Sequence, residues 1–93
     1  MGVVLDSLYA KILQRKGSPH PASYTARLLA AGEDEILKKL GEEAMEVILA
    51  AKGQGNARLV AEVADLVYHL LVLLASRNLT LADVEAELER RRR

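Results

Sequence analysis

The stretch from residue 57 to residue 77 constrains the fold most, because it is apolar in nearly every direction around a helix axis. Its apolar side chains are Leu59, Val60, Val63, Ala64, Leu66, Val67, Leu70, Leu71, Val72, Leu73 and Leu74. A helix that is apolar all round must be buried nearly all round. A chain of 93 residues buries only a thin core. Neighbours for every side of this helix are therefore easiest to find in a second subunit, and we expect a homodimer or a larger homo-oligomer.

The remaining segments also predict helices, and none shows the period-two alternation of a strand. The segment from Gly17 to Pro21 breaks any helix, because it holds two prolines and a glycine. We expect helices over residues 3–15, from about 23 to Gly32, from the cap Asp34 to Gly53, from the cap Asn56 to about 77, and from a capping box at 80–83 onward. The chain is thus predicted to be one all-α domain over residues 1–93, a bundle of four to five helices whose core a second copy completes.

Composition argues against several classes of function. There is no cysteine, which excludes a disulfide framework and a thiolate metal site. The 13 basic and 13 acidic residues balance, so no general nucleic-acid-binding surface is expected, and the block from Arg90 to Arg93 is interpreted as a solvated helix end. The longest apolar run, Leu70 to Ala75, is far shorter than the roughly 20 residues of a membrane span. With no signal peptide either, we expect a cytoplasmic protein without nucleic-acid or membrane partners.

Glu62, Asp65 and His69 form a narrow polar stripe on the apolar helix, because spacings of three and four residues share one face. Two neighbouring carboxylates on a buried helix cost several kcal/mol each unless they are paired or bind a cation. The preceding helix supplies Glu43 and Glu46, three residues apart. An antiparallel hairpin about the turn at 53–55 would bring the two carboxylate pairs together.

Four carboxylates facing one cleft make an oxygen-ligand site suited to Mg²⁺, with Mn²⁺ as an alternative. The other interpretation treats the acids of residues 42–46 as a solvated helix face balanced by lysines. It pairs Glu62 and Asp65 with Arg58, Arg27 or a lysine of a partner chain.

Six further residues have both a functional and a structural interpretation. Glu42 is expected outside the ligand set, as a partner of a lysine, with a role as base for the attacking water left open. Lys39 either contacts a phosphate or pairs with the acids that follow it. The hydroxyls of Ser23, Tyr24 and Thr25 could reach ribose or phosphate, or simply cap a helix. His69 either orients a ligand or substrate, or is a satisfied core histidine.

The acidic pattern, E-E-x-x-E at 42–46 followed by E-x-x-D at 62–65, resembles the MazG-like superfamily of all-α nucleoside-triphosphate pyrophosphohydrolases. Three further segments, 23–26, 39–43 and 64–74, resemble the phosphoribosyl-ATP pyrophosphohydrolases within it. The resemblance runs from Leu5 to about Arg90. No acidic position departs from the pattern.

The resemblance implies Mg²⁺-dependent hydrolysis of phosphoribosyl-ATP to phosphoribosyl-AMP and pyrophosphate, the second step of histidine biosynthesis. It implies metal ligands at Glu43, Glu46, Glu62 and Asp65. Such enzymes are often fused to a cyclohydrolase domain, and because 93 residues leave no room for one, we expect the free-standing form. Two alternatives stay open: a house-cleaning pyrophosphohydrolase of other nucleoside triphosphates, and a non-catalytic helical dimerisation module.

Overall fold

The chain forms helices and no strand over residues 1–18 and 22–92, the part that this computed structural model describes. The helices are α1 (Val3–Arg15), α2 (Tyr24–Ala31), α3 (Glu33–Gly53), α4 (Asn56–Ser76) and α5 (Leu81–Arg91). The predicted all-α class is confirmed. The predicted break from Gly17 to Pro21 falls in part on residues 19–21, which lie outside the described residues.

Two of the predicted helix caps are present in the structure. The Ser23 hydroxyl accepts a hydrogen bond of 3.2 Å from the backbone N–H of Ala26 and so begins α2. Thr80 and Asp83 form the expected capping box at the start of α5, since each side chain accepts a bond from the backbone N–H of the other. These local bonds satisfy N–H groups that have no partner inside their own helix.

Two other caps were predicted wrongly. Asp34 does not begin α3, and Asn56 does not cap α4. In both cases the preceding glycine takes the cap position, Gly32 with φ of 101° and Gly55 with φ of 88°. Because glycine adopts these angles without a steric penalty, the chain turns at once from one helix into the next and needs no side-chain cap.

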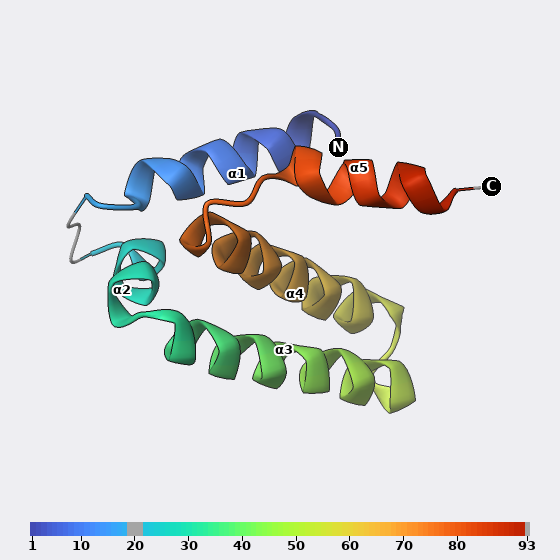
Figure 1. Cartoon of the computed structure of the whole chain (residues 1–93). Coiled ribbons are helices and arrows are strands. Elements are labelled where there is room, and N and C mark those ends of the chain that lie inside the picture. The colour runs from blue at the N-terminus through green and yellow to red at the C-terminus, as the bar shows by residue number, and fades with distance from the viewer. Residues whose placement is uncertain (19–21, 93) are drawn as a thin grey trace.

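The centre of the molecule is the antiparallel pair α3 and α4, joined by a turn at Gln54 and Gly55. In Figure 1, α4 lies between α3 on one side and α1 on the other, and α2 closes one end. Ile12, Ile36 and Val72 are the most deeply buried large side chains and come from α1, α3 and α4. Each contributes about 1.5–3 kcal/mol through burial, so the three helices share one core.

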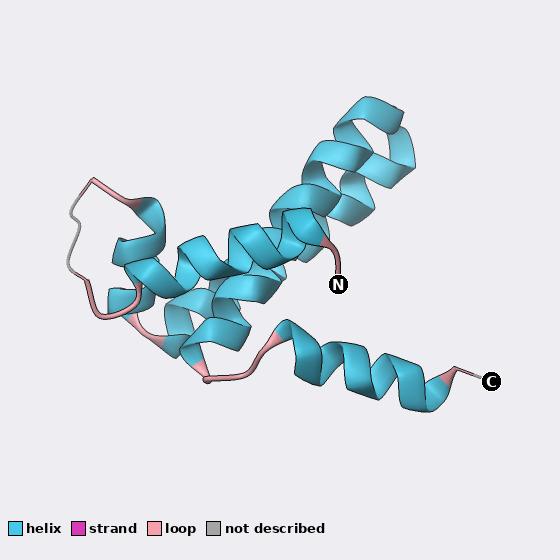
Figure 2. Cartoon of the chain, turned by 90° about the horizontal axis from the view of Figure 1, so that it is seen from above, coloured by secondary structure: helices cyan, strands magenta, loops and turns pink. Residues whose placement is uncertain are grey.

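The helix α5 leaves the other four, and its C-terminal end projects away from them (Figures 1 and 2). Its first residue, Leu81, is buried in the core. The linker before it is held by α1 and by the residue that follows α1, because Tyr9 donates a hydrogen bond to the Leu79 carbonyl and Lys16 donates one to the side chain of Asn78. Asn78 has φ of 60° and supplies the left-handed stop that the sequence predicts for α4.

Within one chain, α4 is buried mainly toward its C-terminal half. Leu71, Val72 and Ala75 are in the core, whereas Val60 is 69% and Val63 is 41% exposed. By length and composition alone α4 could cross a membrane, with a mean hydropathy of 1.8 over its most apolar stretch. The core helix of a soluble protein meets the same criterion, and α4 supplies buried side chains to this core. The length and hydropathy of α4 are therefore only weak evidence for a membrane-spanning helix.

Candidate metal centre

Three carboxylates come together where α3 and α4 face each other. Glu43 lies on α3, and Glu62 and Asp65 lie one turn apart on α4. One oxygen from each carboxylate lies within 4.8 Å of the others. Glu62 is only 5% exposed, Glu43 is half-buried, and Asp65 is exposed. The cluster is therefore buried at Glu62 and accessible to solvent at Asp65.

This donor set fits a hard divalent cation. Three like charges at such distances repel one another, and burial of Glu62 adds a desolvation cost. A divalent cation would offset both terms, and carboxylate oxygens are the ligands that Mg²⁺ and Mn²⁺ prefer. The structure thus brings together three of the four carboxylates that the sequence predicted to meet.

Glu62 also has the ion-pair partner that the alternative interpretation requires. The Arg58 guanidinium lies 3.4 Å from the Glu62 carboxylate, one turn earlier on α4. The Arg58 side chain is 57% exposed, whereas that of Glu62 is 6% exposed. Among the described residues, 1–18 and 22–92, no basic group forms an ion pair with Glu43 or Asp65. One arginine therefore balances one of the three negative charges.

The other two predicted acids of α3 lie outside this group. Glu46 is half-buried one turn beyond Glu43 and is not among the three converging carboxylates. Glu42 is exposed and pairs with Lys39 at 3.3 Å. The hydrogen bond that the Lys39 ammonium donates to the Glu42 carboxylate is the main cause that raises the pKa of Lys39. The structural interpretation of Lys39, pairing along its own helix, is therefore realised, although with a residue three positions away.

The remaining predicted residues form a polar and aromatic network between α2 and α4. His69 is 5% exposed, and its Nδ1 lies 2.8 Å from the backbone carbonyl of Asp65. Its Nε2 lies 3.0 Å from the hydroxyl of Tyr24. Thr25 shares a hydrogen bond with Tyr68. The hydroxyls of Tyr24 and Thr25 thus bond within the protein.

Tyr68 is the member of this network that the sequence analysis missed. Its position could have identified it, since Tyr68 follows Asp65 by three residues and so lies beside the acidic stripe on the helix. Its ring contacts both Tyr24 and His69. Three aromatic rings, those of Tyr24, Tyr68 and His69, therefore gather close to the candidate metal ligand Asp65.

Burial is the main cause that raises the pKa of the Tyr24 hydroxyl above 10.0. The positive charge of Lys39 lowers that pKa, and the negative charge of Glu43 raises it. The Tyr24 hydroxyl is therefore neutral near pH 7 and lies within the electrostatic field of the acidic cluster.

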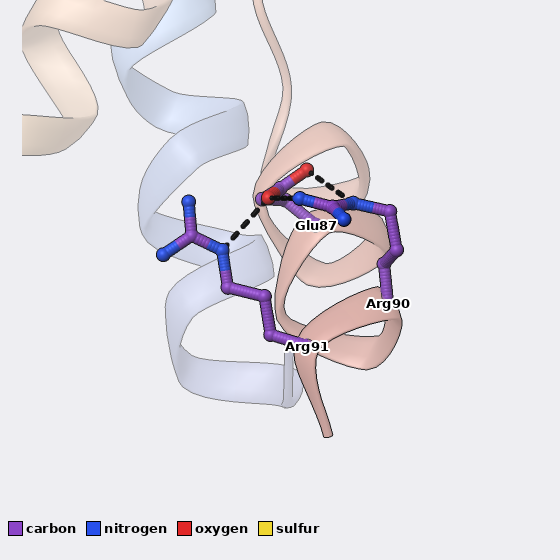
Figure 3. Close-up of polar contacts among 3 residues, drawn as sticks. All are labelled: Glu87, Arg90 and Arg91. Atoms are coloured by element: carbon purple, nitrogen blue, oxygen red, sulfur yellow. Dashed lines mark hydrogen bonds and ion pairs between the residues drawn. The ribbon is translucent and has the colours of Figure 1, made fainter. Parts of the chain in front are cut away.

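Away from this centre, the basic end of α5 is paired with its own acids. Arg90 and Arg91 both donate to Glu87, as Figure 3 shows, and Arg92 lies 2.8 Å from Glu89. These exposed pairs along one helix agree with a solvated helix end.

Known proteins are similar to this chain over nearly its whole length. The family model described as phosphoribosyl-ATP pyrophosphohydrolase matches residues 5–92. The chain belongs to this family. The resemblance predicted from the acidic pattern is thereby confirmed.

Relatives of the phosphoribosyl-ATP pyrophosphohydrolase family agree with this assignment. The phosphoribosyl-ATP pyrophosphatase of Listeria welshimeri is 57% identical over 88 residues, which cover 95% of this chain and 84% of the relative. That of Pelotomaculum thermopropionicum is 57% identical over 89 residues, covering 96% and 91%. The histidine biosynthesis bifunctional protein HisIE of Caldanaerobacter subterraneus is 51% identical over 95% of this chain, which corresponds to 43% of that longer protein.

Proposed function

We propose that this chain hydrolyses phosphoribosyl-ATP to phosphoribosyl-AMP and pyrophosphate, the second step of histidine biosynthesis. Family membership over residues 5–92 supports the reaction. The observation that carries the chemistry is the convergence of Glu43, Glu62 and Asp65 between α3 and α4. We assign the activity to one domain, residues 1–93, in the cytoplasm.

In this proposal Glu43, Glu62 and Asp65 hold Mg²⁺, or Mn²⁺ in its place. Bound at these carboxylates, the ion would neutralise phosphate charge and lower the pKa of a water molecule. Glu46, one turn along α3, remains a fourth ligand in the proposal, reached through a water or a change of rotamer. The partial burial of Glu46 on the same helix as Glu43 supports this role, because low solvent exposure strengthens the interaction of a carboxylate with a cation.

The other assigned residues act on the substrate or on their neighbours. Lys39 contacts a phosphate, and Glu42, which pairs with it, fixes the position of the ammonium group. A role for Glu42 as base toward the attacking water is the alternative. Ser23, Tyr24, Thr25 and His69 are assigned to the substrate side of the site. Tyr24 and Thr25 hold α2 against α4 through their bonds to His69 and Tyr68, and Ser23 caps α2.

We further propose that the enzyme is a homodimer without nucleic-acid or membrane partners. Val60, Val63, Val67, Leu70 and Leu74 repeat along α4 at alternating spacings of three and four, the pattern of a helix–helix seam. The seam continues into an apolar groove of about 310 Å³ between α1, α4 and α5. A second copy fits this surface, because a twofold axis would pair the seam with itself.

The test is pyrophosphate release from phosphoribosyl-ATP with Mg²⁺, measured beside a panel of ordinary nucleoside triphosphates. We expect release from phosphoribosyl-ATP alone. Glu62→Gln should lower kcat/KM at least about 100-fold, because metal stabilisation of the phosphate charge is worth several kcal/mol. Glu89→Gln changes an exposed acid on α5 in the same way and should leave kcat/KM unchanged.

The possible outcomes separate the candidate functions. Release from other triphosphates but not from phosphoribosyl-ATP would contradict the histidine-pathway assignment and favour a house-cleaning pyrophosphohydrolase. If no nucleotide releases pyrophosphate, the assignment of an enzymatic activity would be contradicted, and a helical dimerisation module would be favoured.

A further inference from the structure

Tyr24 lies at the junction of α2 and α4 with its ring held by two others. Its ring centroid is 6.3 Å from that of Tyr68 and 5.9 Å from that of His69. Tyr68 and His69 are 5.0 Å apart and nearly perpendicular, at 87°. Edge-to-face pairs of this kind restrict the rings that form them. Tyr24 is therefore a fixed aromatic side chain rather than a mobile surface residue.

The hydroxyl of Tyr24 is already occupied. The backbone carbonyl of Asp65 can only accept, so His69 Nδ1 carries the proton and donates to it. In the neutral imidazole Nε2 is then an acceptor, and the Tyr24 hydroxyl donates to it across 3.0 Å. The donor of Tyr24 thus points to a buried histidine, while 42% of the residue remains exposed. The hydroxyl proton of Tyr24 is thus engaged, and its ring remains available to a ligand.

This ring lies beside the phosphate end of the proposed site. Two hydrogen bonds in series, through His69, connect Tyr24 to the backbone of the candidate ligand Asp65. The charges of Lys39 and Glu43 both act on the Tyr24 hydroxyl. A nucleotide whose phosphates lie at the carboxylate cluster therefore has its nucleoside within reach of this ring.

We propose that Tyr24 packs its ring against the purine base of the nucleotide and that His69 and Tyr68 hold the ring in place. The inference rests on the proposed function for the location of the phosphates. A flat aromatic ring whose hydroxyl is engaged offers an adenine base a π-surface and offers a ribose little. Tyr24 is thus a specificity residue for the base.

The test measures binding of AMP and of ribose 5-phosphate by titration calorimetry with Mg²⁺. The two probes share the phosphoribose and differ in the base. In Tyr24→Leu, we expect AMP affinity to fall about 5- to 100-fold, the range that stacking of one base gives, and ribose 5-phosphate affinity to change less than about 2-fold. Tyr24→Phe keeps the ring and loses the hydroxyl, so it should retain most of the preference for AMP.

The ratio of the two affinities within one variant separates a base contact from a folding defect. Equal losses for both probes in Tyr24→Leu, or an AMP affinity equal to wild type, would overturn the inference. Hydrolysis of phosphoribosyl-ATP by the wild type is scored separately. If the wild type hydrolyses phosphoribosyl-ATP and Tyr24→Leu keeps the preference for AMP, the base contact is overturned and the proposed function stands. If AMP binding depends on Tyr24 but the wild type hydrolyses nothing, the proposed function is overturned and the base contact stands.

Discussion

Glu62 is 5% exposed on a helix whose other buried side chains are His69 and three apolar residues. That Glu62 and Asp65 share one face of the helix could be predicted from their spacing of three residues, because helical periodicity does not depend on tertiary structure. Glu43 was predicted to join them, and it does. Which turn of α3 faces them could not be predicted, because it depends on the register that the turn at Gln54 and Gly55 sets between the helices. That register brings Glu43 into the cluster and leaves Glu46 outside it.

The Arg58–Glu62 ion pair provides a prediction at this scale. If a cation occupies the cluster, Arg58 matters most when the cation is absent, because Arg58 is the basic residue that pairs with Glu62 among the described residues. For Arg58→Ala we expect the melting temperature to fall by about 4–8 °C with a chelator, and by less than about 2 °C with saturating Mg²⁺. Calorimetry or circular dichroism measures both values.

A matched control removes another arginine from an ion pair. Arg77 pairs with Glu33 away from the cluster, so the effect of Arg77→Ala should be the same with and without Mg²⁺. An equal loss for Arg58→Ala in both conditions would show that Glu62 is a structural ion-pair partner and not a metal ligand.

At the scale of elements, the hydrophobic pattern predicted every helix of the described chain and misplaced two starts, that of α3 by two residues and that of α4 by one. Apolar periodicity determines where a helix is buried, whereas its first residue depends on backbone angles that the pattern does not contain. Ser23 and Thr80 were recognisable because their side chains bond to the backbone. Gly32 and Gly55 act through φ, which leaves no side-chain signal.

The turn between α3 and α4 offers a matched pair of glycines. Gly55 has φ of 88° and ψ of 164°, a region that is essentially restricted to glycine, whereas Gly53 ends α3 without a positive φ. We expect Gly55→Ala to lower the free energy of unfolding by about 1–3 kcal/mol. Gly53→Ala should be neutral or stabilise by up to about 1 kcal/mol. Both positions have open space for a Cβ atom, so backbone strain alone separates them.

Chemical denaturation monitored by helical circular dichroism measures both variants under one condition. A loss of stability in Gly53→Ala as large as that in Gly55→Ala would contradict the assignment of strain to Gly55.

For the whole molecule, the apolar residues of α4 predicted a partner because one small chain cannot cover them. The structure of one chain leaves Val60 at 69%, Val63 at 41% and Leu70 at 42% exposure, so the requirement remains after folding. The sequence could indicate that α4 has more apolar surface than one chain can bury. It could not indicate which face of α4 stays exposed within one chain. That side depends on how α1, α3 and α5 pack around the helix.

The proposed seam on α4 is tested by a charge placed within it. Val63→Glu should convert a dimer into a monomer in sedimentation velocity, because burying two unpaired carboxylates at a twofold interface costs several kcal/mol. Ile48→Glu introduces the same charge at an exposed position of α3, outside the seam, and should leave the dimer intact. Dissociation by Ile48→Glu and not by Val63→Glu would place the interface on α3 instead.

The α3–α4 hairpin has a consequence for how such an enzyme can be combined with others. The converging carboxylates lie between Glu43 and Asp65, so one short contiguous stretch of chain carries them. The first and last helices, α1 and α5, are not part of this hairpin, and Figure 1 shows them across α4 from α3. A second catalytic unit attached at either terminus would not interrupt the hairpin. The arrangement is modular, because an addition at either terminus leaves the stretch that carries the converging carboxylates unchanged.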